Sequence, residues 1–310
     1  MNDPILHHYP ASPFSEKVRL VLGFKGLAWR SVTVPVMMPK PDVVALTGGY
    51  RRTPFLQIGA DVYCDTALMC RVLDRLAPQP PLLPAAGAAL APILAQWADS
   101  ALFWAAVPLT IQLGGPAGLL PEASPEFLQA FAADRAAMSA GLRRPGPHDA
   151  RAHLANYLGW LEGLLGDGRA FVLGAEPCIA DFAIAQSPWF IRRSPKAAAL
   201  LLPPYPRLQA WTERVAAFGH GSASELTSGD ALAVAAGAGR HAPCRVDPSL
   251  GFDAGSDVTV NALDYGADPV PGRLVGLSLD EVVLERVDER AGRVHVHFPR
   301  IGYQIKALRA

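Results

Sequence analysis

The spacing of apolar residues in the first part of the chain predicts a sheet combined with helices. Four short apolar runs predict strands: residues 5–8, 29–36, 54–58 and 61–64. Two amphipathic runs predict helices, the first with Val18, Val21 and Leu22 on one face: residues 16–26 and 66–76. The connection between the second and third strands carries no pattern that assigns it. This order indicates a mixed sheet covered by helices.

A proline-rich stretch at residues 78–84 marks a linker, and the pattern after it is helical. Leu154, Leu158 and Leu161 fall on one helical stripe. Ser124, which stands before a proline, is typical of a helix start. The predicted helices cover residues 90–112 (as one helix or two), 124–140, 151–165, 179–192 and 205–218. We therefore expect the second region to be all-helical.

At Gly219 the pattern changes again, because the following residues are rich in Gly, Ala and Ser and hold one short helical run at 230–236. Beyond Pro243, period-two alternation predicts four strands: residues 258–263, 273–277, 281–287 and 293–298. These strands indicate a small barrel or sandwich. The predicted organisation has an α/β domain, an all-helical domain, a linker and a small β-rich domain, in that order: residues 1–78, 88–218, 219–243 and 244–310.

Composition narrows the class of protein. The chain has 310 residues, of which 50% are hydrophobic and 18% charged, so we expect a globular protein of two or three domains. Lys and Arg together number 28, as do Asp and Glu, and the resulting net charge of zero removes the basic surface expected of a nucleic-acid binder. The N-terminus lacks a signal-peptide pattern, and Pro108 interrupts the longest apolar stretch. We expect a cytoplasmic protein without a membrane partner.

The residues that commonly bind metals show no spacing typical of a metal site. The four cysteines have no CxxC pair and are interpreted as reduced thiols: Cys64, Cys70, Cys178 and Cys244. Two histidine pairs lack a carboxylate or cysteine at ligand spacing: His7 with His8, and His295 with His297. The sequence therefore predicts no metal.

Four short segments of the first two regions stand out together. Residues 12–19 (SPFSEKVR) follow the first strand and open the first helix. Residues 52–56 (RTPFL) precede the third strand, and the pair Asp65-Thr66 opens the next helix. Residues 171–183 (FVLGAEPCIADFA) lead into a later helix, where Asp181 can reach back to the backbone N–H of residue 178. Together these segments resemble the glutathione transferase family, in particular its serine and cysteine classes of bacterial type, over residues 4 to about 218. The last segment resembles the family's buried helix-capping motif, with a cysteine where the family has Ser or Thr.

The resemblance implies a thioredoxin-like domain followed by the family's all-helical domain, with glutathione as co-substrate. It implies that Ser12 activates the glutathione thiol and that five residues bind the peptide: Phe14, Thr53, Pro54, Asp65 and Thr66. In the family the proline is cis and the residue before it pairs its backbone with the cysteinyl part. The acid and the hydroxyl residue that open the next helix bind the γ-glutamyl end. A homodimer is the family's expected assembly.

The physical chemistry of Ser12 agrees with this role. A thiol must be deprotonated to act as a nucleophile, and a helix N-terminus stabilises an anion by ~0.3–1 kcal/mol, up to ~2. A hydroxyl that donates to the thiolate adds ~1.5–3 kcal/mol. Together these effects amount to roughly 2–5 kcal/mol, which lowers the pKa of the thiol by about 1.5–3.5 units. Ser12 is then a hydrogen-bond donor and not itself the nucleophile.

Other residues compete for, or extend, these roles. Tyr9 lies at the end of the first strand, where other classes of the family carry the activating hydroxyl. Ser15 stands where a thioredoxin has its second cysteine, so dithiol–disulfide chemistry is not expected at this site. Arg51 and Arg52 are candidates for the glycyl carboxylate, with ordinary surface arginines as the alternative. Three aromatic residues are candidates for the wall of a second-substrate pocket or for the core: Trp97, Phe103 and Trp104.

Two functions follow from these residues. The leading hypothesis is an enzyme that adds the sulfur of glutathione to a small hydrophobic electrophile, or uses the same thiolate for lyase, isomerase or dehalogenase chemistry. The alternative is a non-catalytic protein that uses the same fold to bind or interact, because folds alone do not carry function. Residues 219–310 form an extension that most members lack, and their sequence does not decide between covering the glutathione site, mediating assembly and binding another molecule.

Overall fold

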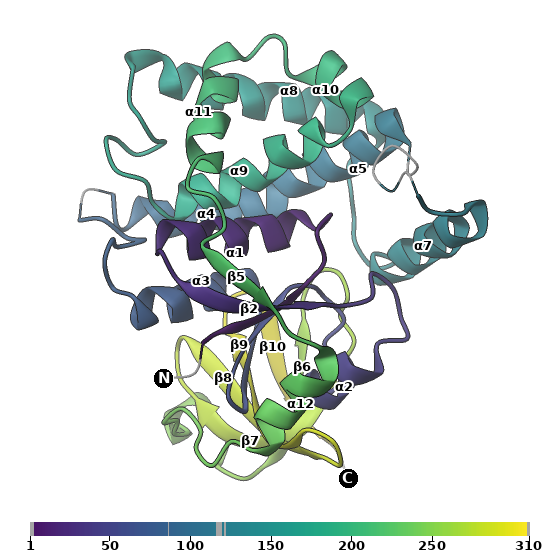
Figure 1. Ribbon diagram of the computed structural model, residues 1–310, viewed down its shortest axis with the longest axis vertical. Helices are drawn as coiled ribbons and strands as arrows, with labels where there is room; N and C mark the ends of the chain where they lie inside the picture. The colour runs from purple at the N-terminus through teal and green to yellow at the C-terminus, as the bar shows by residue number, and fades with distance from the viewer. Residues whose placement is uncertain (1–2, 86, 116–119, 121, 309–310) are drawn as a thin grey trace.

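The computed structural model describes residues 3–85, 87–115, 120 and 122–308. Its N-terminal region confirms the predicted thioredoxin-like arrangement of strands and helices (Figure 1). The elements are β1 (Ile5–His8), α1 (Pro13–Phe24), β2 (Ala28–Thr33), α2 (Pro41–Thr47), β3 (Phe55–Ile58), β4 (Asp61–Cys64) and α3 (Thr66–Leu76). The connection that the sequence left unassigned contains α2, and the second strand ends three residues earlier than predicted, at Thr33.

The helix α1 forms where its start signals predict it. The Ser12 hydroxyl caps the helix by accepting from the backbone N–H of Ser15 at 3.1 Å, and Pro13 occupies the first helical position. Val18, Val21 and most other residues of the helix are buried. This burial on both sides arises because α1 lies between the sheet and the helical region, packed against α3 and α9 (Figure 1).

The second region is all-helical, as predicted, and contains one helix that the sequence did not indicate, α10. Its elements are α4 (Leu90–Trp97), the π-helical turn η1 (Ala98–Leu102), α5 (Phe103–Gly114), α7 (Pro125–Met138), α8 (Pro147–Leu164), the 3₁₀ turn η2 (Leu165–Asp167), α9 (Ile179–Arg192), α10 (Pro195–Leu201) and α11 (Pro206–Ala216). By length and composition alone, the continuous stretch Leu90–Gly114 is apolar enough to cross a membrane, with a mean hydropathy of 1.2. In the structure it packs against α8 and α9 as a core element of the helical region.

A buried carboxylate begins the central helix α9. Asp181 is fully buried, and one of its oxygens accepts from the backbone N–H of Cys178 at 2.9 Å, the reach-back bond expected from the sequence. Its other oxygen accepts from the backbone N–H of Val172 and from the indole N–H of Trp211, both at 2.9 Å. Asp181 therefore ties the start of α9 to the preceding loop and to α11.

The C-terminal region is β-rich, as predicted, and its strands continue the N-terminal sheet. Its elements are β5 (Ser222–Glu225), α12 (Ser228–Ala236), the 3₁₀ turn η3 (Pro248–Leu250), β6 (Asp257–Ala262), β7 (Val270–Leu277), β8 (Glu281–Asp288), β9 (Gly292–Pro299) and β10 (Tyr303–Ala307). All of these strands join the N-terminal sheet, in the order β10-β6-β7-β8-β9-β4-β3-β1-β2-β5. The sequence did not indicate this pairing between the two regions.

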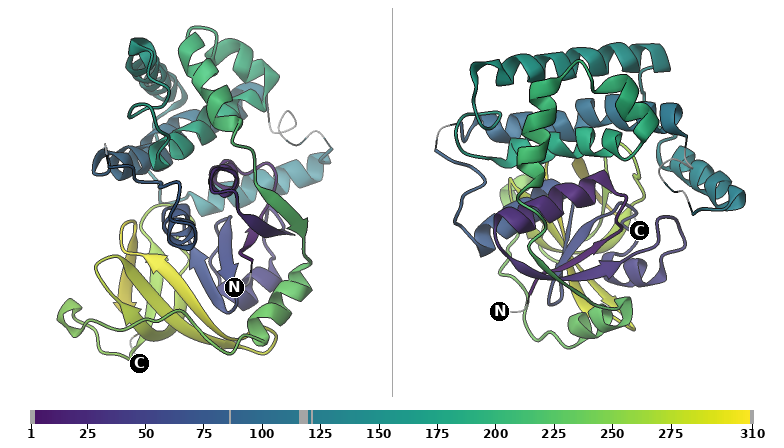
Figure 2. Two further views of the ribbon diagram at one scale, coloured as in Figure 1. Left: turned by 60° about the vertical axis from the view of Figure 1, so that its left-hand side comes forward. Right: turned by 45° about the horizontal axis from the view of Figure 1, so that its top comes forward.

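Both edges of the N-terminal sheet are extended in this way (Figure 2). Strand β9 pairs in parallel with β4, with Asp61 opposite His295, and β5 pairs in parallel with β2 at the other edge. Strand β5 lies in the segment interpreted from its composition as a linker. It carries no apolar pattern, and its residues are exposed, so backbone pairing alone makes it a strand.

Two histidines at the end of β1 give the fold a specific pH dependence. His7 and His8 are 1% and 6% exposed, and burial lowers the pKa of each imidazole from 6.5 to about 4, assisted at His8 by the charge of Arg19. The unfolded chain binds these protons more readily below pH 6.5, so the folded state loses stability as the pH falls from 6.5 towards 4.

We expect each histidine to contribute up to roughly 3 kcal/mol to this loss. Urea unfolding measured at several pH values across this window checks it, with His7→Gln expected to unfold with a shallower dependence on pH than the unsubstituted chain. The exposed His153 provides the control, since His153→Gln is expected to leave the slope unchanged. Equal slopes for the unsubstituted chain and His7→Gln would contradict this assignment.

Candidate functional site

The five residues that the resemblance assigned to peptide binding line one cavity of ≈ 270 Å³, called here the first cavity: Phe14, Thr53, Pro54, Asp65 and Thr66. They come from the start of α1, the loop before β3 and the start of α3. The helical region contributes Gln96 and Asp99, and the C-terminal region contributes Tyr265 from the β6–β7 loop and Tyr303 from β10. The structure therefore brings the separate sequence segments together around one space.

The loop before β3 presents Thr53 to this cavity. The peptide bond between Thr53 and Pro54 is cis, as the resemblance implied. Behind it, the buried ammonium of Lys40 donates to the Thr53 hydroxyl at 3.2 Å. Burial, with the nearby guanidinium of Arg135 as the next cause, lowers the pKa of Lys40 to about 8. Lys40 was not identified from the sequence. Its hydrogen bond fixes the position of the Thr53 side chain.

Asp65 has a backbone conformation that is uncommon for a residue with a side chain. Its φ is 76°, and no other non-glycine residue in the described part of the chain has a positive φ. One carboxylate oxygen caps α3 by accepting from the backbone N–H of Ala67 at 2.9 Å, and the backbone N–H of Asp65 donates to the Tyr50 hydroxyl at 3.1 Å. Such strained conformations concentrate at functional sites, which supports a binding role for this carboxylate.

A buried ion pair lies beside Asp65. The ammonium of Lys17 is fully buried, donates to the Thr66 hydroxyl at 3.1 Å and pairs with Asp99 at 2.5 Å. Although burial opposes the charged form, the Asp99 carboxylate raises the pKa of Lys17, so we assign a charged ammonium here. Gln186 donates to the other Asp99 oxygen at 2.7 Å. The pair fixes the hydroxyl of Thr66 and adds both signs of charge to the first cavity.

Ser12 lies in a second cavity of ≈ 380 Å³, which shares the residues Phe14, Arg52, Thr53 and Tyr265 with the first. Ser12 is 2% exposed, at the N-terminal end of α1. Tyr9 lines the same cavity, and burial raises the pKa of its phenol, while the positive charge of Arg135 opposes this rise. The hydroxyls of Ser12 and Tyr9 therefore both lie next to the first cavity, and their positions do not show which of them activates a thiol there.

The second cavity is walled mainly by aromatic and aliphatic side chains of the helical region. Phe103 and Trp104 line it, as proposed from the sequence for a second-substrate pocket, and Phe14 stacks against Phe103 with ring centroids 4.6 Å apart. Trp97 is not among the residues that line this cavity and instead packs edge-on against Tyr157 at 5.3 Å. Two of the three aromatic candidates thus face the cavity.

The C-terminal strands close over the rim of the first cavity. Arg52 pairs with Asp264, donates to the backbone carbonyl of Tyr265 at 2.9 Å, and lies 4.1 Å above the Tyr265 ring. The Tyr303 hydroxyl lies 3.2 Å from the Asp65 carboxylate. Residues of the C-terminal region therefore line the cavity to which the resemblance assigned the peptide.

The two arginines that were candidates for a glycyl carboxylate are both engaged within the protein. Arg51 donates to Asp134 of α7 at 2.6 Å, and Arg52 is held by the C-terminal region as described. Sequence reasoning missed Lys40, Tyr265 and Tyr303 because each reaches the site from a segment outside the matching motifs. The aromatic residues after Gly219 were the available signal for Tyr265 and Tyr303, but their spacing in the sequence did not indicate that they lie at this cavity.

Comparisons with known proteins agree with this geometry. Residues 6–81 match the family model "Glutathione S-transferase, N-terminal domain" and residues 83–214 match "Glutathione S-transferase, C-terminal domain". A GST-like protein of known structure from Pseudomonas syringae is 41% identical, and the match covers 99% of this chain and 100% of that one with a TM-score of 0.81. The C-terminal strands are part of what these two chains share. A search of curated proteins finds no match to this chain.

More distant structures are similar over the first two regions. FzlA from C. crescentus is 25% identical over 69% of this chain and 88% of its own, with a TM-score of 0.52. The β-etherase LigF from Sphingobium sp. strain SYK-6 is 17% identical over 70% of this chain and 96% of its own, with a TM-score of 0.55. The second likeness concerns the fold alone.

Proposed function

Because the chain belongs to the glutathione S-transferase family, we propose that it binds glutathione in the first cavity and transfers the sulfur to a small hydrophobic electrophile held in the second. One observation carries this proposal. The five residues assigned to glutathione line a cavity that adjoins the one containing Ser12, and the two cavities share a wall. A peptide in the first cavity can thus place its sulfur at the boundary, near a helix N-terminus.

Four of the five residues assigned to glutathione have a specific contact in this proposal. The backbone of Thr53 pairs with the cysteinyl part as an added strand does. The carboxylate of Asp65 takes the γ-glutamyl ammonium, while Thr66 and the N-terminal N–H groups of α3 take the γ-glutamyl carboxylate. Phe14 packs between the two cavities against Phe103.

The chemistry needs no residue to form a covalent bond with the substrate. The thiol proton leaves to solvent, and the Ser12 hydroxyl at the N-terminus of α1 stabilises the remaining thiolate. The sulfur then forms a bond to the electrophilic carbon. Either a leaving group departs with its bonding electrons, or a conjugated double bond takes up the electron pair and then a proton. The apolar second cavity suits an electrophile with little charge.

A second function, non-catalytic binding, is favoured by the position of the C-terminal strands. Tyr303 already contacts the Asp65 carboxylate, and Asp264 already neutralises Arg52. Asp65 and Arg52 are the charged groups that a peptide ligand would use, as acceptor and donor. In this alternative the first cavity binds a ligand without turnover, and the specific role lies in the C-terminal region.

The substitution Asp65→Asn tests the proposed binding of glutathione. Asparagine keeps the helix cap and tolerates a positive φ, so only the charge is removed. We expect calorimetric titration to show one glutathione per chain for the unsubstituted protein, and an affinity roughly 10- to 100-fold weaker for Asp65→Asn, as for a lost hydrogen bond to a charged group. The exposed Asp167 provides the matched control, because Asp167→Asn is expected to bind like the unsubstituted chain.

Three results would change the account. Equal affinities of Asp65→Asn and the unsubstituted chain would contradict the placement of the γ-glutamyl end. No binding of glutathione by the unsubstituted chain would contradict the proposed function altogether. Binding without any acceleration of the reaction with a chloronitrobenzene, or with other electrophiles in a panel, would favour the non-catalytic alternative.

A further inference from the structure

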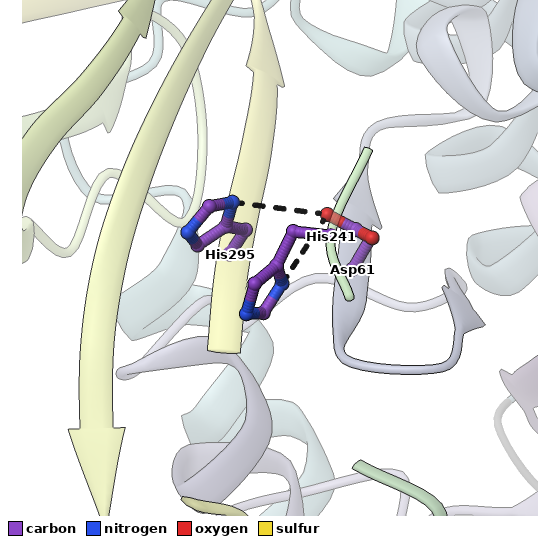
Figure 3. Close-up of side chains that lie close together, drawn as sticks. All are labelled: Asp61, His241 and His295. Atoms are coloured by element: carbon purple, nitrogen blue, oxygen red, sulfur yellow. Dashed lines mark ion pairs between the residues drawn. The ribbon is translucent and has the colours of Figure 1, made fainter. Parts of the chain in front are cut away.

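Three side chains from distant parts of the sequence meet where the C-terminal region joins the N-terminal sheet (Figure 3). Asp61 begins β4, His295 lies opposite it on β9, and His241 comes from the segment between α12 and η3. One donor atom from each of the three lies within 4.8 Å of the other two. The two imidazole rings stack with centroids 3.7 Å apart, and both Nδ1 atoms face the same Asp61 oxygen, at 3.7 and 3.9 Å.

The donor atoms of both histidines are left without partners. The Nδ1 atoms of His241 and His295 are buried, and neither has a hydrogen-bond partner within the described residues. His295 is 8% exposed, so water does not readily satisfy it. Distances of 3.7 and 3.9 Å to the carboxylate are too long for hydrogen bonds. Buried polar atoms are almost always paired, so two that converge on one carboxylate oxygen need an explanation.

The separations of the donors are close to those around a cation. Metal–nitrogen and metal–oxygen bonds of about 2.0–2.2 Å in a tetrahedral site place neighbouring donors roughly 3.3–3.5 Å apart. The two observed separations from Asp61 exceed this by only a few tenths of an ångström. Because an imidazole binds a metal in the plane of its ring, the two stacked rings must also turn towards one common point when an ion binds. Hydrogen bonds between the three donors, by contrast, would need much shorter separations.

Hydrogen bonds hold the Asp61 carboxylate in place, as the outer hydrogen-bond partners of a metal-binding carboxylate do. Its Oδ1 accepts from His297 Nε2 at 2.9 Å, and His297 is in turn bonded to Glu281 at 2.5 Å. Its Oδ2 accepts from the backbone N–H of Ala242 at 2.9 Å. Such outer partners fix the orientation of a ligating carboxylate and leave Oδ1 a lone pair for a cation.

The local charge also permits a cation. Two carboxylates stand around the three donors in addition to Asp61: Glu281, bonded to His297, and Glu285, whose Oε2 lies 3.8 Å from His295 Nε2. Arg293 pairs with Glu285 at 3.0 Å, and His297, Arg71 and Arg75 lie near Glu281. Three carboxylates therefore lie around the donors and are balanced in part by these groups.

We propose that Asp61, His241 and His295 bind a divalent transition-metal ion, with zinc as the best match to two imidazoles and one carboxylate. Three protein ligands leave one tetrahedral position for water. Since the ligands come from the N-terminal sheet, the connecting segment and the C-terminal strands, the ion joins the three segments and stabilises their association. The sequence-based expectation of no metal arose because these ligands are 54 to 234 residues apart and show no motif.

Titration of the chelator-treated full-length protein with zinc chloride tests this site. We expect calorimetry to give one high-affinity zinc per chain, and the midpoint of thermal unfolding to rise as zinc is added. In His241→Gln and His295→Gln the affinity is expected to fall by a factor of roughly ten to one hundred or more. The His241 side chain is 19% exposed and that of His295 10%, so His241→Gln is expected to disturb the packing less than His295→Gln does.

Two controls identify other sources of binding. His153→Gln removes an exposed imidazole on α8, and Cys244→Ser removes the exposed thiol; both variants are expected to bind zinc like the unsubstituted chain. Zinc binding that His241→Gln and His295→Gln leave unchanged would overturn the proposal. Binding that disappears with Cys244 or His153, or no binding of zinc by the unsubstituted chain, would overturn it equally.

Discussion

Replacing Asp181 by alanine is expected to lower the free energy of unfolding by about 3–9 kcal/mol. The substitution leaves three buried donors without an acceptor, the backbone N–H groups of Val172 and Cys178 and the indole N–H of Trp211. Each buried donor left unpaired costs about 1–3 kcal/mol. Since folded domains are stable by only about 5–15 kcal/mol, this loss is a large share of the total. Urea unfolding followed by tryptophan fluorescence measures it.

The exposed carboxylate of Asp167 is the control for this prediction. It pairs with Arg169 at the surface, and exposed pairs contribute about 0–1 kcal/mol. Asp167→Ala is therefore expected to leave the free energy of unfolding nearly unchanged. A similar loss for the two variants would show that the buried bonds of Asp181 do not stabilise the start of α9 as described.

Replacing Ser12 by alanine is expected to lower kcat/KM for an electrophile at neutral pH by roughly 10- to 150-fold. The reason is the lost hydrogen bond from the hydroxyl to the glutathione thiolate, worth about 1.5–3 kcal/mol. The affinity for glutathione is expected to change little, because the residues proposed to bind the peptide lie in the first cavity, which Ser12 does not line. Steady-state kinetics with a chloronitrobenzene, combined with calorimetric titration, measures both quantities.

Two further variants show whether the fall in kcat/KM is caused by the loss of the Ser12 hydroxyl. Ser12→Thr keeps the hydroxyl and the helix cap, so it is expected to retain most of the activity. Tyr9→Phe removes the competing hydroxyl in the same cavity and is expected to be much less impaired than Ser12→Ala. If Tyr9→Phe loses activity and Ser12→Ala does not, Tyr9 is the activating residue.

Local signals predicted the parts of this fold that depend on neighbours in sequence. The cap and proline at Ser12 and Pro13 predicted where α1 begins, and the reach-back bond of Asp181 followed from its spacing to Cys178. The residues assigned to glutathione were found through a resemblance to a family in which the matching segments occur in the same order along the chain. The structure places them around one cavity because they follow, or lie between, adjoining elements of one sheet.

The remaining features depend on pairing between distant segments, which the sequence pattern does not encode. Four strands with alternating residues predicted a β-rich region, but nothing in Val294, Val296 or Phe298 indicates that β9 pairs with β4. The exposed strand β5 has no apolar pattern at all. The contacts of Arg52 with Asp264, and of Asp65 with Tyr303, follow from that pairing and were equally hidden.

In the proposed function, this protein lowers the pKa of the thiol of bound glutathione. Ultraviolet absorbance of the thiolate, recorded across pH for the unsubstituted protein saturated with glutathione, measures this pKa. We expect a thiol pKa about 1.5–3.5 units below that of free glutathione, as the combined effect of the helix N-terminus and one hydroxyl. A bound thiol that titrates at the same pH as the free peptide would contradict it.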